Sequence, residues 1–172
     1  MRNAVLSTLL ILGIFLLLGI LAGFYFISKR PQPTLRTAEV KIGENVFAVE
    51  VASTTISRVR GLSGRNGLAE NEGMFFIFDE LGTNGFWMKD VKFPIDIIWI
   101  AGDSPSQISQ GEIWEGKVVG FAENAAPEPG VPLWKLKIYY PPELVDRVLE
   151  VNAGMVKRLG IKVGDRVKFN AP

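Results

Sequence analysis

The sequence predicts an α+β, β-rich fold, a rolled sheet or small barrel with two short helices, preceded by one N-terminal transmembrane helix. Three observations predict this class. An uncharged apolar run lies near the N-terminus, many short strand-like segments separated by turn residues follow it, and two segments have the caps of short helices. We therefore divide the chain into a membrane anchor (1–30), a proline-containing linker (31–38) and a β-rich domain (39–170).

The predicted anchor is the uncharged run at 4–27. As a helix rising about 1.5 Å per residue, this run slightly exceeds a hydrocarbon core of about 30 Å. An aromatic triplet at 24–26 and basic residues at 29–30 are typical of a membrane interface. The run is longer than the apolar region of a cleaved signal peptide and lacks a small-x-small site. We expect an uncleaved single-pass anchor whose partner is the lipid bilayer.

Charge and composition exclude several classes of function. Four of the 19 basic residues precede position 37, which leaves 15 basic against 18 acidic residues and a net charge of −3 for the domain. Nucleic-acid binding is therefore disfavoured. The chain has neither cysteine nor histidine, so thiolate nucleophiles, zinc-thiolate sites and Ser-His-Asp triads are excluded. We expect no cofactor and no dedicated metal site, since Asp-x-Asp-x-Asp spacing is absent.

The first elements of the domain are a hairpin and a helix. Alternation over 46–51 predicts a half-buried strand, which is entered through a tight loop at 43–45. The Ser-Thr-Thr cluster at 53–55 supplies an N-cap for a short helix that reaches Arg60, and Gly61 ends it.

Strands dominate the middle of the domain. We expect strands at 74–78 and 95–100 and a short aromatic one at 85–88. Pro94 fits only at the start of its strand, because its missing N–H would interrupt the ladder further along. Gly102 and the residues after it predict a turn.

The last third contains further strands around an irregular loop. Strands are predicted at 113–121, 136–140 and 148–151, with a proline-rich surface loop at 123–132. We then expect a short helix at 153–159, which Gly160 ends, and a hairpin-like edge at 161–169.

Five fragments in the domain occur in a characteristic order between Glu39 and Phe169. They are RGL at 60–62 with Arg65, GMFFIF at 73–78, FWMK at 86–89, PIDII at 94–98 and LEVNAG at 149–154. Together they resemble the family called domain of unknown function 192. The resemblance implies one compact, mostly β domain, often exported or membrane-anchored, without an established activity.

The resemblance also predicts on which side of the membrane the domain lies and how long one loop is. It favours an extracytoplasmic domain, whereas the charges that flank the apolar run weakly favour a cytoplasmic one. The segment 103–116 is longer than the turn that the family pattern predicts, so we expect an insertion there.

Asp96 is the first candidate site residue, because it interrupts an apolar strand. A buried carboxylate is costly without a cation or several hydrogen bonds. The candidate cations are Arg60, Arg65 and Lys89, and we favour Arg60, which can make a two-point bond. The pair is either structural or part of a polar pocket.

The FWMK fragment and Glu150 are the other candidates. If side chains alternate, Trp87 and Lys89 share a face, which suits a flat polar ligand such as a saccharide, while Trp87 and Met88 could instead fill the core. Glu150 interrupts another apolar strand. With Asp96 it could form an acid and base pair for glycoside cleavage, which needs carboxylates about 5 to 9.5 Å apart.

We predict a membrane-anchored, non-catalytic domain that binds a small polar ligand or envelope component. The alternatives are a glycosidase-like carboxylate hydrolase with Asp96 and Glu150 as catalytic residues, and a protein-interaction module with an apolar patch around the proline loop. A protein partner is left open. The predicted ligand-binding residues are Arg60, Arg65, Trp87, Met88, Lys89, Asp96 and Glu150.

Overall fold

The computed structural model describes residues 35–102 and 109–172. By its internal contacts the chain divides into one unit at Met1–Thr34 and a second at Leu35–Pro172. The predicted span at 4–27 and residues 31–34 of the predicted linker lie outside the described residues. Within the described ranges, no helix combines the length and apolar character needed to cross a bilayer.

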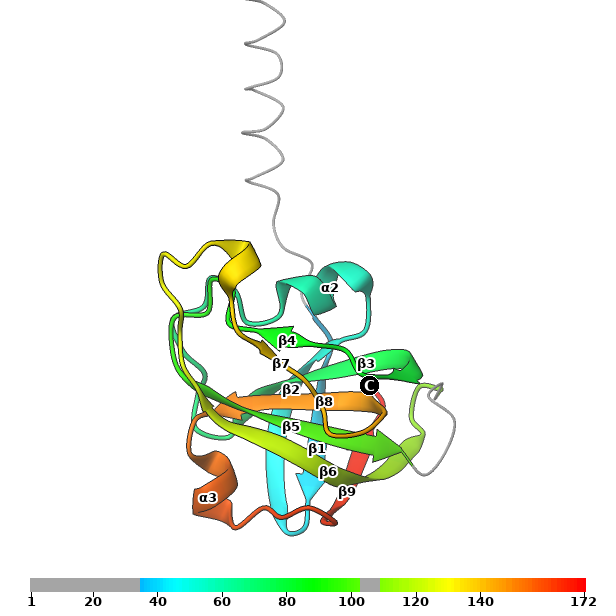
Figure 1. Cartoon of the computed structure of the whole chain (residues 1–172). Coiled ribbons are helices and arrows are strands. Elements are labelled where there is room, and N and C mark those ends of the chain that lie inside the picture. The colour runs from blue at the N-terminus through cyan, green and yellow to red at the C-terminus, as the bar shows by residue number, and fades with distance from the viewer. Residues whose placement is uncertain (1–34, 103–108) are drawn as a thin grey trace, which may run out of the picture. The chain divides into compact units, whose positions relative to one another are not determined.

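The domain is a closed β-barrel with a small second sheet beside it (Figure 1). Around the barrel the strand order is β1-β2-β3-β8-β5-β6-β9, and β4 pairs with β7 in the second sheet. The barrel strands are β1 (Thr37–Ile42), β2 (Asn45–Ala52), β3 (Glu72–Gly82), β5 (Ile95–Gly102), β6 (Ile113–Ala125), β8 (Val145–Asn152) and β9 (Arg166–Asn170). The remaining elements are α2 (Thr55–Arg60), β4 (Phe86–Trp87), the 3-10 turn η1 (Leu133–Lys135), β7 (Ile138–Tyr139) and α3 (Met155–Leu159).

The predicted β-rich class is confirmed, and the sheet closes rather than merely rolling. Strand β9 pairs with β1 on one side and with β6 on the other. The hairpin-like edge expected at 161–169 is therefore wrong: β9 is an interior strand that completes the barrel. The physical reason is that closure pairs the backbone groups that an edge strand would leave free.

The predicted helix after β2 forms as expected and serves as a crossover. Thr54 and Ser57 make a capping box, and the Gly61 N–H donates to the Ser57 carbonyl oxygen. Because β2 and β3 run parallel, a connection must return along the barrel between them, and α2 lies in it. The helix therefore covers the outside of the wall near β3.

Strand β5 is buried on both faces, which explains its nearly unbroken apolar run. Ile98 and Ile100 join the cluster inside the barrel, to which every barrel strand contributes. Ile95, Ile97 and Trp99 join a second cluster outside the wall, together with residues of β3, β4 and β8. A strand covered on both sides needs apolar residues at successive positions.

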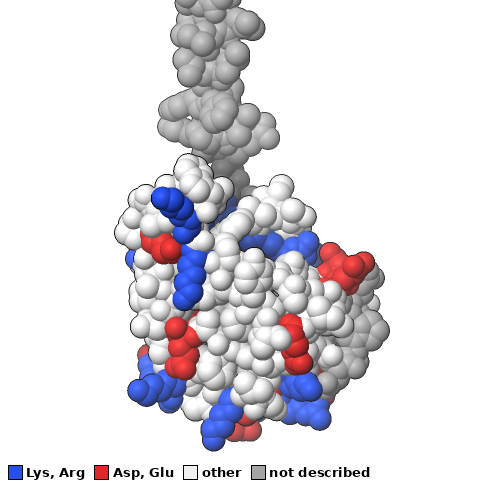
Figure 2. All heavy atoms as spheres, in the orientation of Figure 1, with Lys and Arg blue, Asp and Glu red and all other residues white. Residues whose placement is uncertain are grey.

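The surface carries its charges unevenly. On the face shown in Figure 2, Lys, Arg, Asp and Glu lie mainly around the margins, and the centre consists of other residue types. This face has no continuous basic band of the kind that phosphate backbones require.

Candidate functional site

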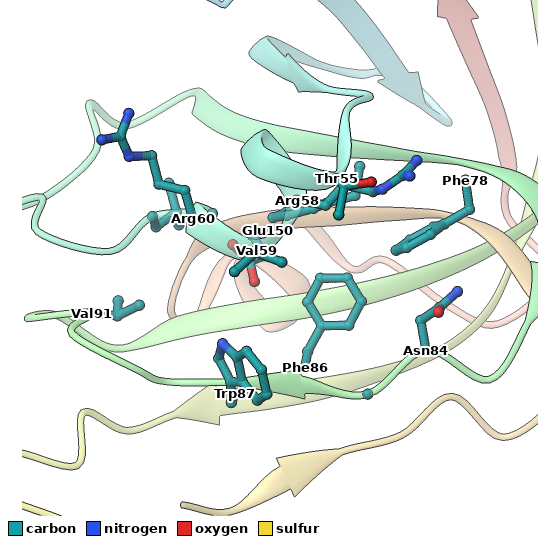
Figure 3. A pocket seen from close by; sticks show the side chains of 14 residues that line it. Thr55, Arg58, Val59, Arg60, Phe78, Asn84, Phe86, Trp87, Val91 and Glu150 are labelled. Atoms are coloured by element: carbon teal, nitrogen blue, oxygen red, sulfur yellow. The ribbon is translucent and has the colours of Figure 1, made fainter. Parts of the chain in front are cut away.

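A pocket of about 240 Å³ opens outside the barrel wall, between α2 and β4 (Figure 3). One side of it comes from α2 and its C-cap, the other from the chain around β4, and residues of β3 and β8 line it as well. The lining residues are Thr55, Arg58, Val59, Arg60, Gly61, Leu62, Phe76, Phe78, Asn84, Gly85, Phe86, Trp87, Val91 and Glu150.

Glu150 is the carboxylic acid of this pocket. It lies on β8 between Met74 of β3 and Ile97 of β5, and only 4% of its surface is exposed. Its carboxyl group receives no hydrogen bond from any part of the chain that the structure describes. Burial raises the pKa of Glu150 to about 8, with Arg65 opposing the rise. At neutral pH the group is thus a neutral acid that can both donate and accept.

Aromatic rings form the wall that faces α2. The rings of Phe76 and Phe86 meet edge to face at 5.0 Å, and Phe78 adds a third ring 6.3 Å from Phe86. Trp87 follows on β4 and is 38% exposed. Gly85 precedes this wall, and a Cβ there would lie 2.5 Å from Ile138 of β7. A side chain at position 85 would therefore force β4 and β7 apart.

Two arginines from α2 border the pocket, with different surroundings. The Arg58 guanidinium donates to the carbonyl oxygens of Ser53 and Ile77, and it stacks 5.2 Å from the Phe78 ring centre. Arg60 is exposed, and its guanidinium points away from Glu150 in Figure 3. Arg60 is thus the arginine of this rim that is available to a ligand.

Asp96 is buried, as predicted, but its partners differ from the expected cation. Its Oδ1 accepts from the Asn124 backbone N–H at 2.8 Å, and its Oδ2 accepts from the Val156 N–H at 2.9 Å. The predicted bond to Arg60 is therefore wrong. Two main-chain amides supply the donors, one of them at Asn124, where φ is +55°. Asp96 fastens β6 and α3 to β5.

Asp96 and Glu150 lie on opposite faces of the barrel wall. In the β5–β8 register Asp96 pairs with Val151 and Ile97 pairs with Glu150. Adjacent residues of a strand point to opposite sides, so Asp96 shares the inner face with Val151 while Glu150 points outward. The structure does not bring the two carboxyl groups into one cleft.

Three other predicted residues lie outside the pocket. Arg65 makes a two-point bond with Glu50 at 2.6 and 2.7 Å, which lowers the pKa of Glu50 and raises that of Arg65. Met88 and Lys89 line a separate pocket of about 440 Å³ beside the proline loop. The predicted common face for Trp87 and Lys89 is therefore not observed, because β4 ends at Trp87.

The structure brings together Arg60, Trp87 and Glu150 from the predicted set. Arg58, Asn84 and Phe86 also line this pocket and were not among the predicted site residues. Phe86 lies within the FWMK fragment and could have been included from that signal, whereas nothing in the sequence marks Asn84. Residues 35–102 and 109–172 hold no group of three or more acidic side chains close enough to bind a metal ion.

Comparison with known proteins identifies the family of this chain. The model of DUF192, the family described as "Uncharacterized ACR", matches residues 38–169. The chain belongs to this family. The predicted family resemblance is confirmed, and the match covers the barrel except for its first residue, Thr37, and its last, Asn170. A search among curated proteins finds no match.

Two solved structures are similar to this chain. The first, described as a "putative transcription regulator" from Sinorhizobium meliloti 1021, is 30% identical, with a TM-score of 0.67 over 81% of this chain and 98% of the other. The second is a protein of unknown function from Novosphingobium aromaticivorans DSM 12444, also 30% identical, with a TM-score of 0.65 over 80% and 89%. Because 98% of the first chain is matched, a chain scarcely longer than the barrel forms this fold.

Proposed function

We propose that this DUF192 protein is a membrane-anchored, non-catalytic binding module whose α2–β4 pocket takes a small neutral ligand rich in hydroxyl groups, such as one sugar ring of an envelope component. The observation that carries the proposal is the Glu150 carboxyl group, almost fully buried and without a hydrogen-bond partner among the described residues, in an aromatic pocket. Buried polar groups ordinarily have partners, so an unpaired one that faces a pocket is available to a ligand.

The size of the pocket favours a ligand of one ring. Pockets for drug-sized ligands span about 300–1,000 Å³, and this one measures about 240 Å³. The partly exposed indole of Trp87 offers a broad face for stacking, and Arg60 supplies donors at the rim. A single sugar ring needs these contacts: an apolar face for its C–H groups and polar groups for its hydroxyls.

The protonation state of Glu150 favours a neutral ligand. With a pKa of about 8 the carboxyl group is mainly neutral at pH 7, so it can donate to one hydroxyl oxygen and accept from another. A cationic ligand would instead require the ionised form. Binding of a neutral ligand should therefore weaken as the pH rises through 8.

Two alternative functions receive less support. A glycosidase needs two carboxyl groups across one cleft, whereas Asp96 and Glu150 face opposite sides of the wall. The name of the Sinorhizobium protein suggests a role in transcription, but a net charge of −3 disfavours nucleic-acid binding by this domain. We place the module on the outer side of the membrane, held by residues 4–27.

Titration of the full chain in lipid nanodiscs tests the proposed function. Neutral monosaccharides and short envelope glycans are added while tryptophan fluorescence and saturation-transfer NMR are recorded. We expect binding that Glu150→Leu weakens at least tenfold, because leucine fills the same space without hydrogen bonds. Glu80→Gln, at an exposed carboxylate outside the pocket, serves as the matched control. An absence of any saccharide response, or equal binding by the Glu150→Leu variant, would reject the proposal.

A further inference from the structure

The end of the barrel that carries α2 and η1 exposes large apolar side chains in two separate segments. On α2, Ile56 and Val59 are 80% and 59% exposed, and they lie three residues apart, on one side of the helix. On η1, Leu133 and Trp134 are 52% and 83% exposed. We call these four residues the apolar tips. Such exposure is unusual for a tryptophan on the surface of a globular protein and is typical of a tryptophan at a membrane–water interface.

Basic side chains accompany the apolar tips. Arg60 follows Val59, and Lys135 and Lys137 follow Trp134; all three are exposed. The ammonium group of Lys137 lies 4.4 Å from the centre of the Tyr139 ring. In Figure 2 the raised parts of the surface at this end are white, with blue side chains immediately below them. Apolar tips with cations behind them match a bilayer, whose apolar interior lies beneath anionic phosphates.

The point where the described chain begins lies at this same end. Leu35 packs against the outer apolar cluster, and the Arg36 carbonyl oxygen accepts from the Val51 N–H, near the end of β2 that leads into α2. Seven residues, 28–34, separate Leu35 from the apolar run. At no more than about 3.6 Å per residue they extend at most about 25 Å. If residues 4–27 span a bilayer, the length of this segment limits how far Leu35 can lie from it.

We propose that the apolar tips dock on the surface of an anionic phospholipid bilayer, with Arg60, Lys135 and Lys137 against lipid phosphates. Val59 is both a tip and a lining residue of the α2–β4 pocket. The docked barrel therefore opens this pocket toward the headgroup layer, where a membrane-attached polar group can enter it. The docking itself does not depend on what the pocket binds.

The absence of cysteine allows a direct test on the full chain. Single cysteines replace Ile56, Trp134 or Val163, and each carries the environment-sensitive fluorophore NBD. Val163 is 63% exposed and lies in the turn before β9. The Gly43 N–H, just after β1, donates to the Arg166 carbonyl oxygen, so this turn lies at the end of β1 that is far from Leu35. The Val163→Cys variant is thus the matched control. Each labelled chain is placed in nanodiscs of phosphatidylcholine with or without 30% phosphatidylglycerol.

On anionic discs we expect Ile56→Cys and Trp134→Cys to show a blue-shifted emission and at least threefold lower quenching by aqueous iodide than Val163→Cys. Combining Lys135→Glu with Lys137→Glu should abolish this protection, and the matched control Lys162→Glu should not. Equal iodide quenching at all three positions would overturn the proposal. Protection from iodide that appears only at several chains per disc would also overturn it, because it indicates contact with a second copy of the chain. The same holds if the discs do not retain the full chain.

Discussion

The two buried carboxyl groups of the barrel wall, Asp96 and Glu150, contrast in every respect except burial. They lie one register position apart on neighbouring strands, and both are at least 96% buried. Asp96 faces inward and accepts two backbone hydrogen bonds. Glu150 faces outward into the pocket, receives no hydrogen bond from the described residues, and has a pKa raised to about 8.

The contrast shows how a buried carboxyl group with a structural role can be distinguished from one that is available to a ligand. A carboxylate whose two oxygens both accept main-chain hydrogen bonds has little capacity left for a ligand and holds elements together instead. A buried acid without such partners keeps its full hydrogen-bonding capacity. Burial alone does not distinguish the two roles, whereas the list of hydrogen-bond partners does. Three of the four predictions below test this comparison, and the other concerns a partly exposed ion pair, Glu50 with Arg65.

The largest expected effect is on stability, from Asp96→Ala. Truncation leaves the Asn124 and Val156 amides without their acceptors, at about 1–3 kcal/mol for each. We therefore expect a loss of about 3–5 kcal/mol, measured by urea unfolding. Asp96→Asn retains one acceptor and should lose less. A loss below 1 kcal/mol for the alanine variant would show that the two hydrogen bonds do not hold β6 and α3 in place.

The next effect is a pH dependence that Glu150 causes. In the unfolded chain its carboxyl group ionises near its ordinary pKa of 4.5, whereas in the folded chain it holds its proton until about pH 8. The folded state thus binds more protons over this range, so stability falls as the pH rises from about 4.5 to 8, by at most about 1.4 kcal/mol per unit. Glu150→Gln should flatten the curve of unfolding free energy against pH. A wild-type curve already flat there would contradict the raised pKa.

A smaller effect concerns the half-exposed pair of Glu50 and Arg65. Their two-point bond lowers the pKa of Glu50, so its contribution is present above about pH 4.5 and disappears as the pH falls through the lowered folded value. Solvent screens this pair, and we expect a coupling of about 0.5–1 kcal/mol in a double-mutant cycle with Glu50→Gln and Arg65→Met. The coupling should weaken as the pH falls and Glu50 becomes protonated; a coupling that does not change with pH would mean that packing, rather than charge, links the two residues.

The smallest expected effect is that of Arg60→Ala. Since Arg60 is exposed and not bonded to Asp96, its removal should change the unfolding free energy by less than about 0.5 kcal/mol. Thermal and urea unfolding measure this directly. A loss of several kcal/mol would restore the sequence-based pairing of Arg60 with Asp96 and remove the distinction between the two acids.

The fold was largely predictable where local chemistry decides it. The cluster at 53–55 predicted the region in which α2 begins, Gly61 predicted its end at Arg60, and alternation or apolar runs located the strands. The five ordered fragments predicted the family. Closure was harder to predict, because it depends on β9 pairing with two strands far away in sequence.

The site was predictable only in part, because a single step in strand register decides which face a residue occupies. The sequence indicated that both Asp96 and Glu150 interrupt apolar strands, but not that they face opposite sides. The partners of Asp96 were also hidden, since backbone amides belong to every residue type and leave no mark in composition. Lys89 was predicted to share a face with Trp87, but the strand ends at Trp87, so alternation does not reach Lys89.

Closure of the barrel by its first and last strands has a consequence for biosynthesis. Residues 39–42 of β1 pair with 167–170 of β9, and the Arg36 side chain donates to the Pro172 carbonyl oxygen. These contacts are among the most distant in the domain, so they form late and slow the folding reaction. A ribosome must therefore release nearly all of the domain before the seam can close, and until then β1 presents an open edge that chaperones can hold.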